Sequence, residues 1–122
     1  MKLDELKKNG EAPEWMDDAA LETLVRGYLL PNETPKGMYV RIAKSLSSYY
    51  TNPDYWFDKF FNAMWSNWLC PSSPVLANSG TKRGLTVSCN TVHFADSVNS
   101  IFMKNHEIAM LTKNGAGIGF YV

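Results

Sequence analysis

The sequence predicts an α-rich α/β chain, with an all-helical domain over residues 1–70 and an α/β part over residues 71–122. Two observations support this division. Up to residue 70, apolar residues recur at the three- and four-residue spacing of helices, and capping residues precede the runs. Beyond residue 70 the chain changes to prolines, glycines and a β-branched segment, which indicates extended pieces around one further helix.

Composition excludes several classes of protein. The 122 residues suffice for one small domain, and a 45% apolar content indicates a real core. Twelve basic residues balance twelve acidic ones, which argues against a nucleic-acid-binding or membrane-surface protein. No apolar stretch approaches the ~20 residues of a transmembrane helix, and the charged start lacks the apolar region of a signal peptide. Two cysteines are too few for a disulfide scaffold, so we expect a cytoplasmic protein with free thiols.

Three helices are expected in the first part. The expected N-caps are Asp17 or Asp18, Thr34 and Asn52, and a proline directly follows the last two. The third helix is predicted over residues 54–69. Because its apolar residues cover much of its circumference, we expect it to be buried on several sides, with its tryptophans in the core. These tryptophans are Trp56, Trp65 and Trp68.

The second part is expected to begin with an extended, proline-bounded segment over residues 71–78. A turn at 80–84 and a strand at 85–92 follow, and Asp96 or Ser97 caps a helix that ends at Gly115. The helix residues expected to face inward are Val98, Ile101, Phe102, Ile108, Ala109 and Leu111. The chain then stops within an apolar strand, which predicts a polypeptide that is cut short or that a second chain completes.

Taken singly, the residues that could carry chemistry have simple structural explanations. A cysteine in a strand, such as Cys89, is most often a small buried hydrophobic residue. The same structural explanation is favoured even more strongly for Cys70, which follows a Trp-rich helix. A disulfide between them would need Cα atoms within ~7 Å, which the sequence leaves open. With His93 and His106 they fit no zinc-binding spacing, so no metal site is expected.

The glycines at 115–119 follow a helix and open a strand, which is the reverse of the order in a dinucleotide-binding fingerprint. Alone, they indicate a helix C-cap and tight packing, although small residues also permit a ligand to approach the backbone. Asp96 alone is most simply an N-cap.

The order and spacing of these segments are more informative than any one of them. The segments are PSSPVLANSGT at 71–81, Ser88-Cys89, DSVNSI at 96–101 and KNGAGIG at 113–119. Together they resemble the start of the ten-stranded α/β barrel of ribonucleotide reductase large subunits. GYLLPNETP at 27–35 is similar to the helical N-terminal domain of the same family. The resemblance covers about residues 12–122.

The resemblance implies an oxidoreductase that converts ribonucleotides to deoxyribonucleotides for DNA synthesis by radical and dithiol chemistry. It gives Cys89 the catalytic role of one of two cysteines that reduce the ribose and end as a disulfide. It gives substrate-binding roles to Ser73, Ser88, Ala116 and Gly117. It gives Asp96 the binding of the allosteric specificity effector, a deoxynucleoside triphosphate. These residue types suit the chemistry, because a dithiol supplies two electrons and hydroxyls and backbone amides suit phosphate.

The chain also departs from the family pattern. It has no Asn-x-Cys-x-Glu segment, which carries the thiyl-radical cysteine, and it lacks the second reducing cysteine and the C-terminal cysteine pair. The sequence has no room for the N-terminal ATP-cone that many family members carry. Cys70 matches no catalytic position of the family. We therefore expect the isolated chain to be inactive and to need the missing remainder of the large subunit.

The resemblance further implies that this chain binds no cofactor itself. A small diiron subunit would supply the radical, or alternatively adenosylcobalamin. The other implied partners are the nucleotide substrate, the effector and a reductant of the thioredoxin or glutaredoxin type, with no membrane and no nucleic acid. A diphosphate and a triphosphate substrate both remain open. The rival hypothesis is a non-catalytic helical interaction module derived from the family.

Overall fold

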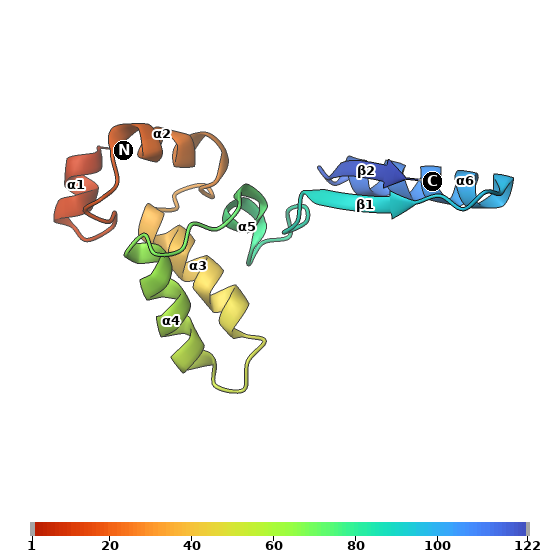
Figure 1. Cartoon of the computed structure of the whole chain (residues 1–122). Helices are drawn as coiled ribbons and strands as arrows, with labels where there is room; N and C mark the ends of the chain where they lie inside the picture. Colours follow the sequence, from red (N-terminus) through yellow and green to blue (C-terminus); the bar gives the residue numbers. More distant parts are fainter. Residues whose placement is uncertain (1, 122) are drawn as a thin grey trace. The chain divides into compact units, whose positions relative to one another are not determined.

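The computed structural model describes residues 2–121, which form two compact units (Figure 1). The first unit ends at Lys82 and the second begins at Arg83. This division falls later in the chain than the predicted change at residue 70, and the assignment of residues 71–82 to the start of a barrel stays a prediction. Within residues 2–121, no helix combines the length and apolarity needed to cross a membrane.

The first unit is built from helices. They are α1 (Leu3–Lys8), α2 (Asp18–Gly27), α3 (Pro35–Ser47), α4 (Pro53–Trp65) and α5 (Ser73–Asn78). The predicted caps are confirmed: Ala20 N donates to the Asp17 carboxylate, Gly37 N to the Thr34 hydroxyl and Tyr55 N to the Asn52 amide oxygen. Of the two aspartates considered for α2, Asp17 is the cap. Each cap satisfies a backbone donor that the helix itself leaves unpaired.

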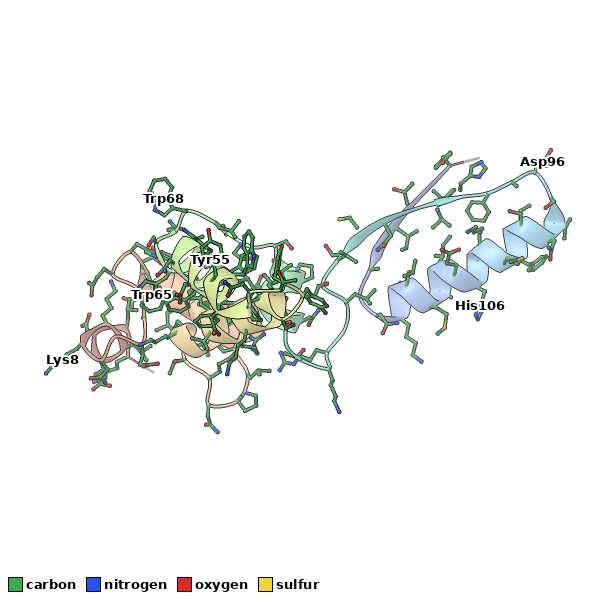
Figure 2. The ribbon with its side chains drawn as sticks, turned by 90° about the horizontal axis from the view of Figure 1, so that it is seen from below. Lys8, Tyr55, Trp65, Trp68, Asp96 and His106 are labelled. Atoms are coloured by element: carbon green, nitrogen blue, oxygen red, sulfur yellow. The ribbon has the colours of Figure 1, made fainter. Side chains whose placement is uncertain are left out.

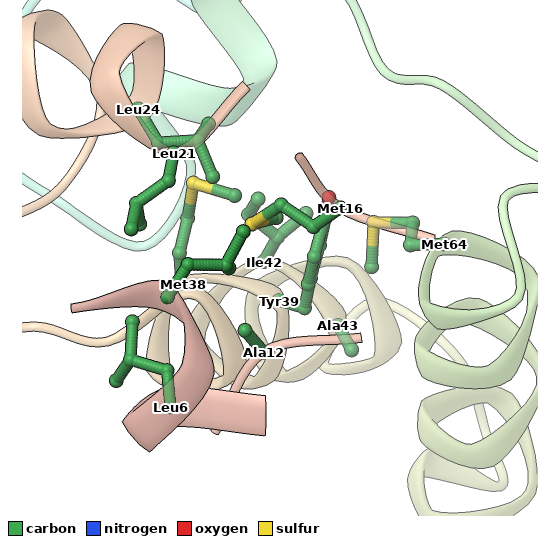
Figure 3. Close-up of a cluster of buried hydrophobic side chains, with 11 residues drawn as sticks. Leu6, Ala12, Met16, Leu21, Leu24, Met38, Tyr39, Ile42, Ala43 and Met64 are labelled. Atoms are coloured by element: carbon green, nitrogen blue, oxygen red, sulfur yellow. The ribbon is translucent and has the colours of Figure 1, made fainter. Parts of the chain in front are cut away.

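The core of this unit forms around α3 (Figure 3). Met38, Ile42 and Ala43 on this helix are fully buried. The other members of this buried cluster belong to the neighbouring helices and to the segment between α1 and α2. They are Leu6 of α1, Leu21 and Leu24 of α2, Met64 of α4, and Ala12 and Met16 of the connecting segment. One cluster therefore holds the first four helices together, in the way a single small domain requires.

Helix α4 is shorter than predicted. It ends at Trp65, because Asn67 adopts a left-handed conformation at φ 60° and the Ala63 carbonyl accepts from the backbone of Trp68 and Leu69. Asparagine is the residue that most often replaces glycine in such a helix ending. Trp68 is 88% exposed and projects from the chain (Figure 2), so its expected place in the core was wrong.

The expected burial of α4 on several sides was also wrong for the described residues. Met64 is the fully buried residue of this helix. Tyr55 is 52% exposed, while the other large rings are half-buried and stack on one another along the helix. The rings of Phe57 and Phe61 are stacked at 6.0 Å, and those of Phe61 and Trp65 at 5.4 Å. Aromatic residues at helical spacing therefore form a partly exposed stripe here and not a second core.

Residues 71–78 were expected to be extended, and this was wrong. Ser73–Asn78 form α5, with Pro74 in the first turn, where a missing N–H costs no helix hydrogen bond. Arg41 of α3 holds the end of α5, because its guanidinium donates to the carbonyls of Leu76 and Ser79. Arg41 also pairs with Glu33 through two hydrogen bonds of 2.8 and 3.0 Å.

The second unit is a strand–helix–strand arrangement. Strands β1 (Cys89–His93) and β2 (Gly117–Tyr121) pair in parallel, and α6 (Val98–Lys113) connects them (Figure 1). The predicted helix cap is Ser97, whose hydroxyl accepts from Ser100 N. The strand predicted at 85–92 is present but begins later, at Cys89.

Helix α6 covers one face of the strand pair. Val92 is buried on that face, and Asn90 and Ile118 are half-buried. The helix itself has no buried residue: Ile108 and Leu111 are half-buried, whereas Val98 and Phe102 are 71% and 69% exposed. The inward-facing set predicted for this helix was therefore mostly wrong, because two strands offer little surface for it to cover.

Candidate active site

The pairing of β1 with β2 places Cys89 directly opposite Gly117. Paired residues of a parallel sheet point to the same face, and residues two apart along a strand share that face. Cys89 and Gly117 therefore lie on the face opposite to Val92, which α6 does not cover. The Cys89 thiol is free and exposed, and a glycine beside it leaves the space next to its sulfur open.

Ser88 and Ala116 lie at the same end of the strand pair. Gly117 N donates to the Ser88 carbonyl at 2.7 Å, and the Ser88 hydroxyl lies 3.8 Å from the Cys89 sulfur. A Cβ on residue 117 would meet the Ser88 carbonyl oxygen at 3.3 Å, so the strands can approach this closely because residue 117 is glycine. The structure thus brings together four of the six predicted site residues, namely Ser88, Cys89, Ala116 and Gly117.

The sequence reasoning missed three residues on the same open face, Thr91, His93 and Tyr121. Their positions follow from the two-residue period of strands, which continues from Cys89 to Thr91 and His93. Gly119 lies opposite Thr91, and the rings of His93 and Tyr121 are 4.8 Å apart at the next pair. The open face therefore runs from the thiol, past two glycines, to an aromatic pair. A register between the strands is needed to see this, and the sequence alone does not supply one.

Asp96 lies in the loop between β1 and α6 (Figure 2). It lines a pocket of about 320 Å³ together with Phe94, Ala95, Ile101 and Phe120. Because Ser97 caps α6, the carboxylate of Asp96 is not needed for the helix, and the simple capping explanation for Asp96 was wrong. An exposed carboxylate beside an apolar pocket is suited to bind the hydroxyls of a ribose while apolar residues cover another part of the ligand.

Ser73 belongs to the helical unit, where it is the first residue of α5. Its hydroxyl lies 2.9 Å from the hydroxyl of Tyr28, so the side chain is held in place. Ser73 is exposed, and Ser72 is the residue directly before α5.

Across positions 2–121, no three histidine, cysteine, aspartate or glutamate side chains lie close enough together to hold an ion. The strand pair itself carries the Cys89 thiol, the Thr91 hydroxyl, the His93 imidazole and the Tyr121 phenol.

Known proteins are similar to this chain in sequence and in fold. A family model described as "Ribonucleotide reductase, all-alpha domain" matches residues 14–84. The ribonucleoside-diphosphate reductase subunit alpha of Synechocystis sp. is 33% identical over 109 residues, which cover 87% of this chain and 14% of that protein. The vitamin B12-dependent ribonucleoside-diphosphate reductase of Thermoplasma acidophilum is 28% identical over 122 residues, which cover 93% of this chain and 16% of that protein.

A solved structure agrees with these matches. The alpha subunit of a class Id ribonucleotide reductase from Actinobacillus ureae has a TM-score of 0.80 at 31% identity, over 88% of this chain and 21% of that one. The match extends beyond the all-alpha domain, so the strand–helix–strand unit is part of the shared fold. The chain spans less than a fifth of the length of the two curated relatives. On this evidence, the chain belongs to the ribonucleotide reductase large-subunit family, whose members are oxidoreductases.

Proposed function

We propose that this chain is part of a ribonucleotide reductase large subunit that reduces ribonucleotides to deoxyribonucleotides, with Cys89 as one of two reducing thiols. The observation that carries the proposal is the position of Cys89. Its free thiol is exposed on the open face of the strand pair, opposite Gly117 and beside the Ser88 hydroxyl. A thiol that reduces a substrate must be reachable by it, which a buried structural cysteine is not.

Two thiols supply the electrons and protons that the proposed reaction consumes. Loss of the 2′-hydroxyl as water takes up two electrons and two protons, which Cys89 and a second cysteine supply as they join in a disulfide. The second cysteine and the radical-carrying cysteine would belong to the remainder of the large subunit. An external dithiol protein, of the thioredoxin or glutaredoxin type, would then restore the thiols.

The other residues would bind nucleotides. Ser88 and the backbone of Ala116 and Gly117 would line the substrate site around Cys89, because small residues let a ligand approach the main chain. The Ser73 hydroxyl would hold a substrate phosphate. Asp96 would bind the ribose of a deoxynucleoside triphosphate effector, with the pocket of Phe94, Ile101 and Phe120 beside it.

The radical would come from another component, and this chain would bind no cofactor itself. The relatives include both a vitamin B12-dependent reductase and the alpha subunit of a class Id enzyme. We propose a small diiron subunit as the radical source, with adenosylcobalamin as the alternative. We further propose that the assembled enzyme works in the cytoplasm.

Reconstitution tests the proposal. The chain is mixed with a polypeptide carrying the Asn-x-Cys-x-Glu segment and the second reducing cysteine, and deoxynucleotide formation is measured with each radical source and a dithiol. We expect no product from either polypeptide alone and product from the mixture. A stable complex of the two that yields no product with either radical source would favour the non-catalytic interaction module instead.

A further inference from the structure

Four aromatic side chains gather on the hairpin formed by α3 and α4. They are Tyr50, just after α3, and Tyr55, Trp56 and Phe60 of α4. The ring centroid of Trp56 is 4.5 Å from that of Tyr50, and the centroids of Tyr55 and Phe60 lie 5.5 and 5.7 Å from it. Such distances are those of aromatic pairs in direct contact. We call this group, with Trp56 at its centre, the Trp56 cluster.

The Trp56 cluster lies largely outside the core of the helical unit. Of its members, Phe60 packs against the buried cluster around α3. Tyr50 and Tyr55 are 42% and 52% exposed, and Trp56 is half-buried. The rings therefore cover one another and leave much apolar surface in water. Single exposed apolar side chains are normal, whereas a contiguous group of them marks a surface that binds a partner.

The sequence of α4 also requires more cover than the helical unit gives it. Apolar residues extend around much of the circumference of this helix, and such helices are buried on several sides. One side packs on the core, where Met64 is fully buried. Tyr55 stays exposed and Trp56 half-exposed among residues 2–121. The part of the chain that the structure describes therefore lacks a second covering surface for α4.

One cation lies at the edge of the Trp56 cluster. The Lys59 ammonium is 5.3 Å from the centre of the Tyr55 ring, within the range of a cation–π contact. No ion pair joins Lys59 to a carboxylate within residues 2–121. Interfaces place an apolar centre inside a polar rim and match charges of opposite sign. A surface that covers these rings is therefore expected to bring a carboxylate to Lys59.

We propose that the Trp56 cluster binds the remainder of the large subunit, which covers it with an apolar patch that carries a carboxylate at its edge. The inference rests on the proposed function, which requires that remainder. The matched part of the Actinobacillus ureae alpha subunit is 21% of that chain, so most of such a subunit lies outside the match and is available to cover these rings. Tryptophan and tyrosine are the residues that most often carry the binding energy of an interface.

The test measures binding between the full chain and the polypeptide that carries the Asn-x-Cys-x-Glu segment and the second reducing cysteine. Calorimetry gives the Kd. Tyr55→Ala should weaken binding about tenfold. It leaves the helix cap intact, because Asn52 accepts from the backbone N–H of residue 55. Val25→Ala is the matched control, since Val25 is also 52% exposed but lies on α2, and it should keep the wild-type Kd. An unchanged Kd in Tyr55→Ala, or equal weakening in both variants, would overturn the proposal.

The carboxylate is tested through the salt dependence of the same Kd. Added salt screens a charge pair at the edge of an interface, so wild-type binding should weaken as the salt concentration rises. Lys59→Met removes the charge and keeps a long apolar side chain, and it should make the Kd less dependent on salt. The same salt dependence in wild type and Lys59→Met would overturn the assigned charge pair.

Hydroxyl-radical footprinting of the unmodified chain gives a readout that needs no variant to fold. The complementary polypeptide should protect Tyr55 and Trp56 from oxidation. Protection by self-association of the chain alone, or by a small diiron subunit alone, would assign the cluster to that partner and overturn the proposal.

Footprinting also separates this inference from the proposed function. A complex that protects Trp56 but forms no deoxynucleotide would support the interface and count against the reductase activity. Product from a complex in which Trp56 stays as reactive as in the free chain would overturn the interface alone.

Discussion

At the scale of single residues, Gly80 follows α5 in a left-handed conformation with φ +71°. A Cβ at this position would lie 2.9 Å from Arg41 Cγ and 3.2 Å from the Arg41 carbonyl oxygen. Gly80→Ala should therefore lower the free energy of unfolding by ~2–3 kcal/mol, since the strained backbone and the displaced Arg41 both contribute. Urea denaturation measures the change.

Gly10 is the matched control for this substitution. Its φ of +68° is nearly the same, but a Cβ there would meet nothing within 4 Å. Gly10→Ala should cost only the backbone strain, ~1 kcal/mol. Equal losses in the two variants would show that the contact with Arg41 contributes nothing.

Asp96 allows a test that separates ligand binding from helix capping. In the reconstituted enzyme, Asp96→Ala should blunt the change in substrate preference that a deoxynucleoside triphosphate produces, because the carboxylate would no longer bind the ribose. Since Ser97 caps α6, this variant should keep its melting temperature, whereas Ser97→Ala should lose ~1 kcal/mol of stability. An unchanged effector response in Asp96→Ala would contradict the proposed role.

At the scale of elements, Arg41 joins α3 to the end of α5 by donating to the Leu76 and Ser79 carbonyls, and it also pairs with Glu33. The side chains of Arg41 and Glu33 are 11% and 10% exposed, so the pair is largely removed from water. Arg41→Met should cost ~3 kcal/mol, because it leaves the Glu33 carboxylate buried without its cation, and should speed hydrogen exchange at the end of α5. The double variant Arg41→Met/Glu33→Gln should recover part of that loss, and an additive loss would contradict this explanation.

The helix beginnings could be predicted because they depend on neighbouring residues. Each cap side chain accepts a hydrogen bond from the backbone N–H three residues later, and the caps are Asp17, Thr34, Asn52 and Ser97. The contact that begins each helix therefore lies within four consecutive residues. The proline after Thr34 and after Asn52 adds a fixed backbone angle at the first helical position.

What could not be predicted depends on longer-range contacts. Helix α5 was missed because Arg41, more than thirty residues earlier, binds its final carbonyls. The exposure of Trp68 and Phe102 was missed because an apolar pattern shows which face should be buried and not whether a covering surface is present. At the candidate site, the pairing of Cys89 with Gly117 depends on strand register, which one sequence does not reveal.

At the scale of the whole molecule, the two compact units differ in how many hydrophobic side chains they bury. The helical unit has a cluster of buried side chains around α3, whereas Val92 and Ala116 are the buried hydrophobic residues that the structure shows from residue 83 onward. Two strands and one helix supply little of the apolar burial that independent stability needs. The second unit should therefore be much the less stable of the two.

Native-state hydrogen exchange measures this difference in the isolated chain. Amides of β2, from Gly117 to Tyr121, should exchange quickly, with local opening free energies near zero, while those in the middle of α3 should be strongly protected. Addition of the complementary polypeptide should slow exchange in β2. Strong protection of β2 in a monomer of the chain alone would contradict this expectation.

The central claim is that Cys89 donates electrons to the substrate. The most direct measurement is multiple turnover by the reconstituted enzyme with Cys89→Ser, a change that preserves size and removes the reducing thiol. The account predicts that turnover is lost while nucleotide binding and folding persist, and that Val87→Ser, at a 55% exposed position just before β1, keeps full turnover. Full turnover by the Cys89→Ser enzyme would contradict the account.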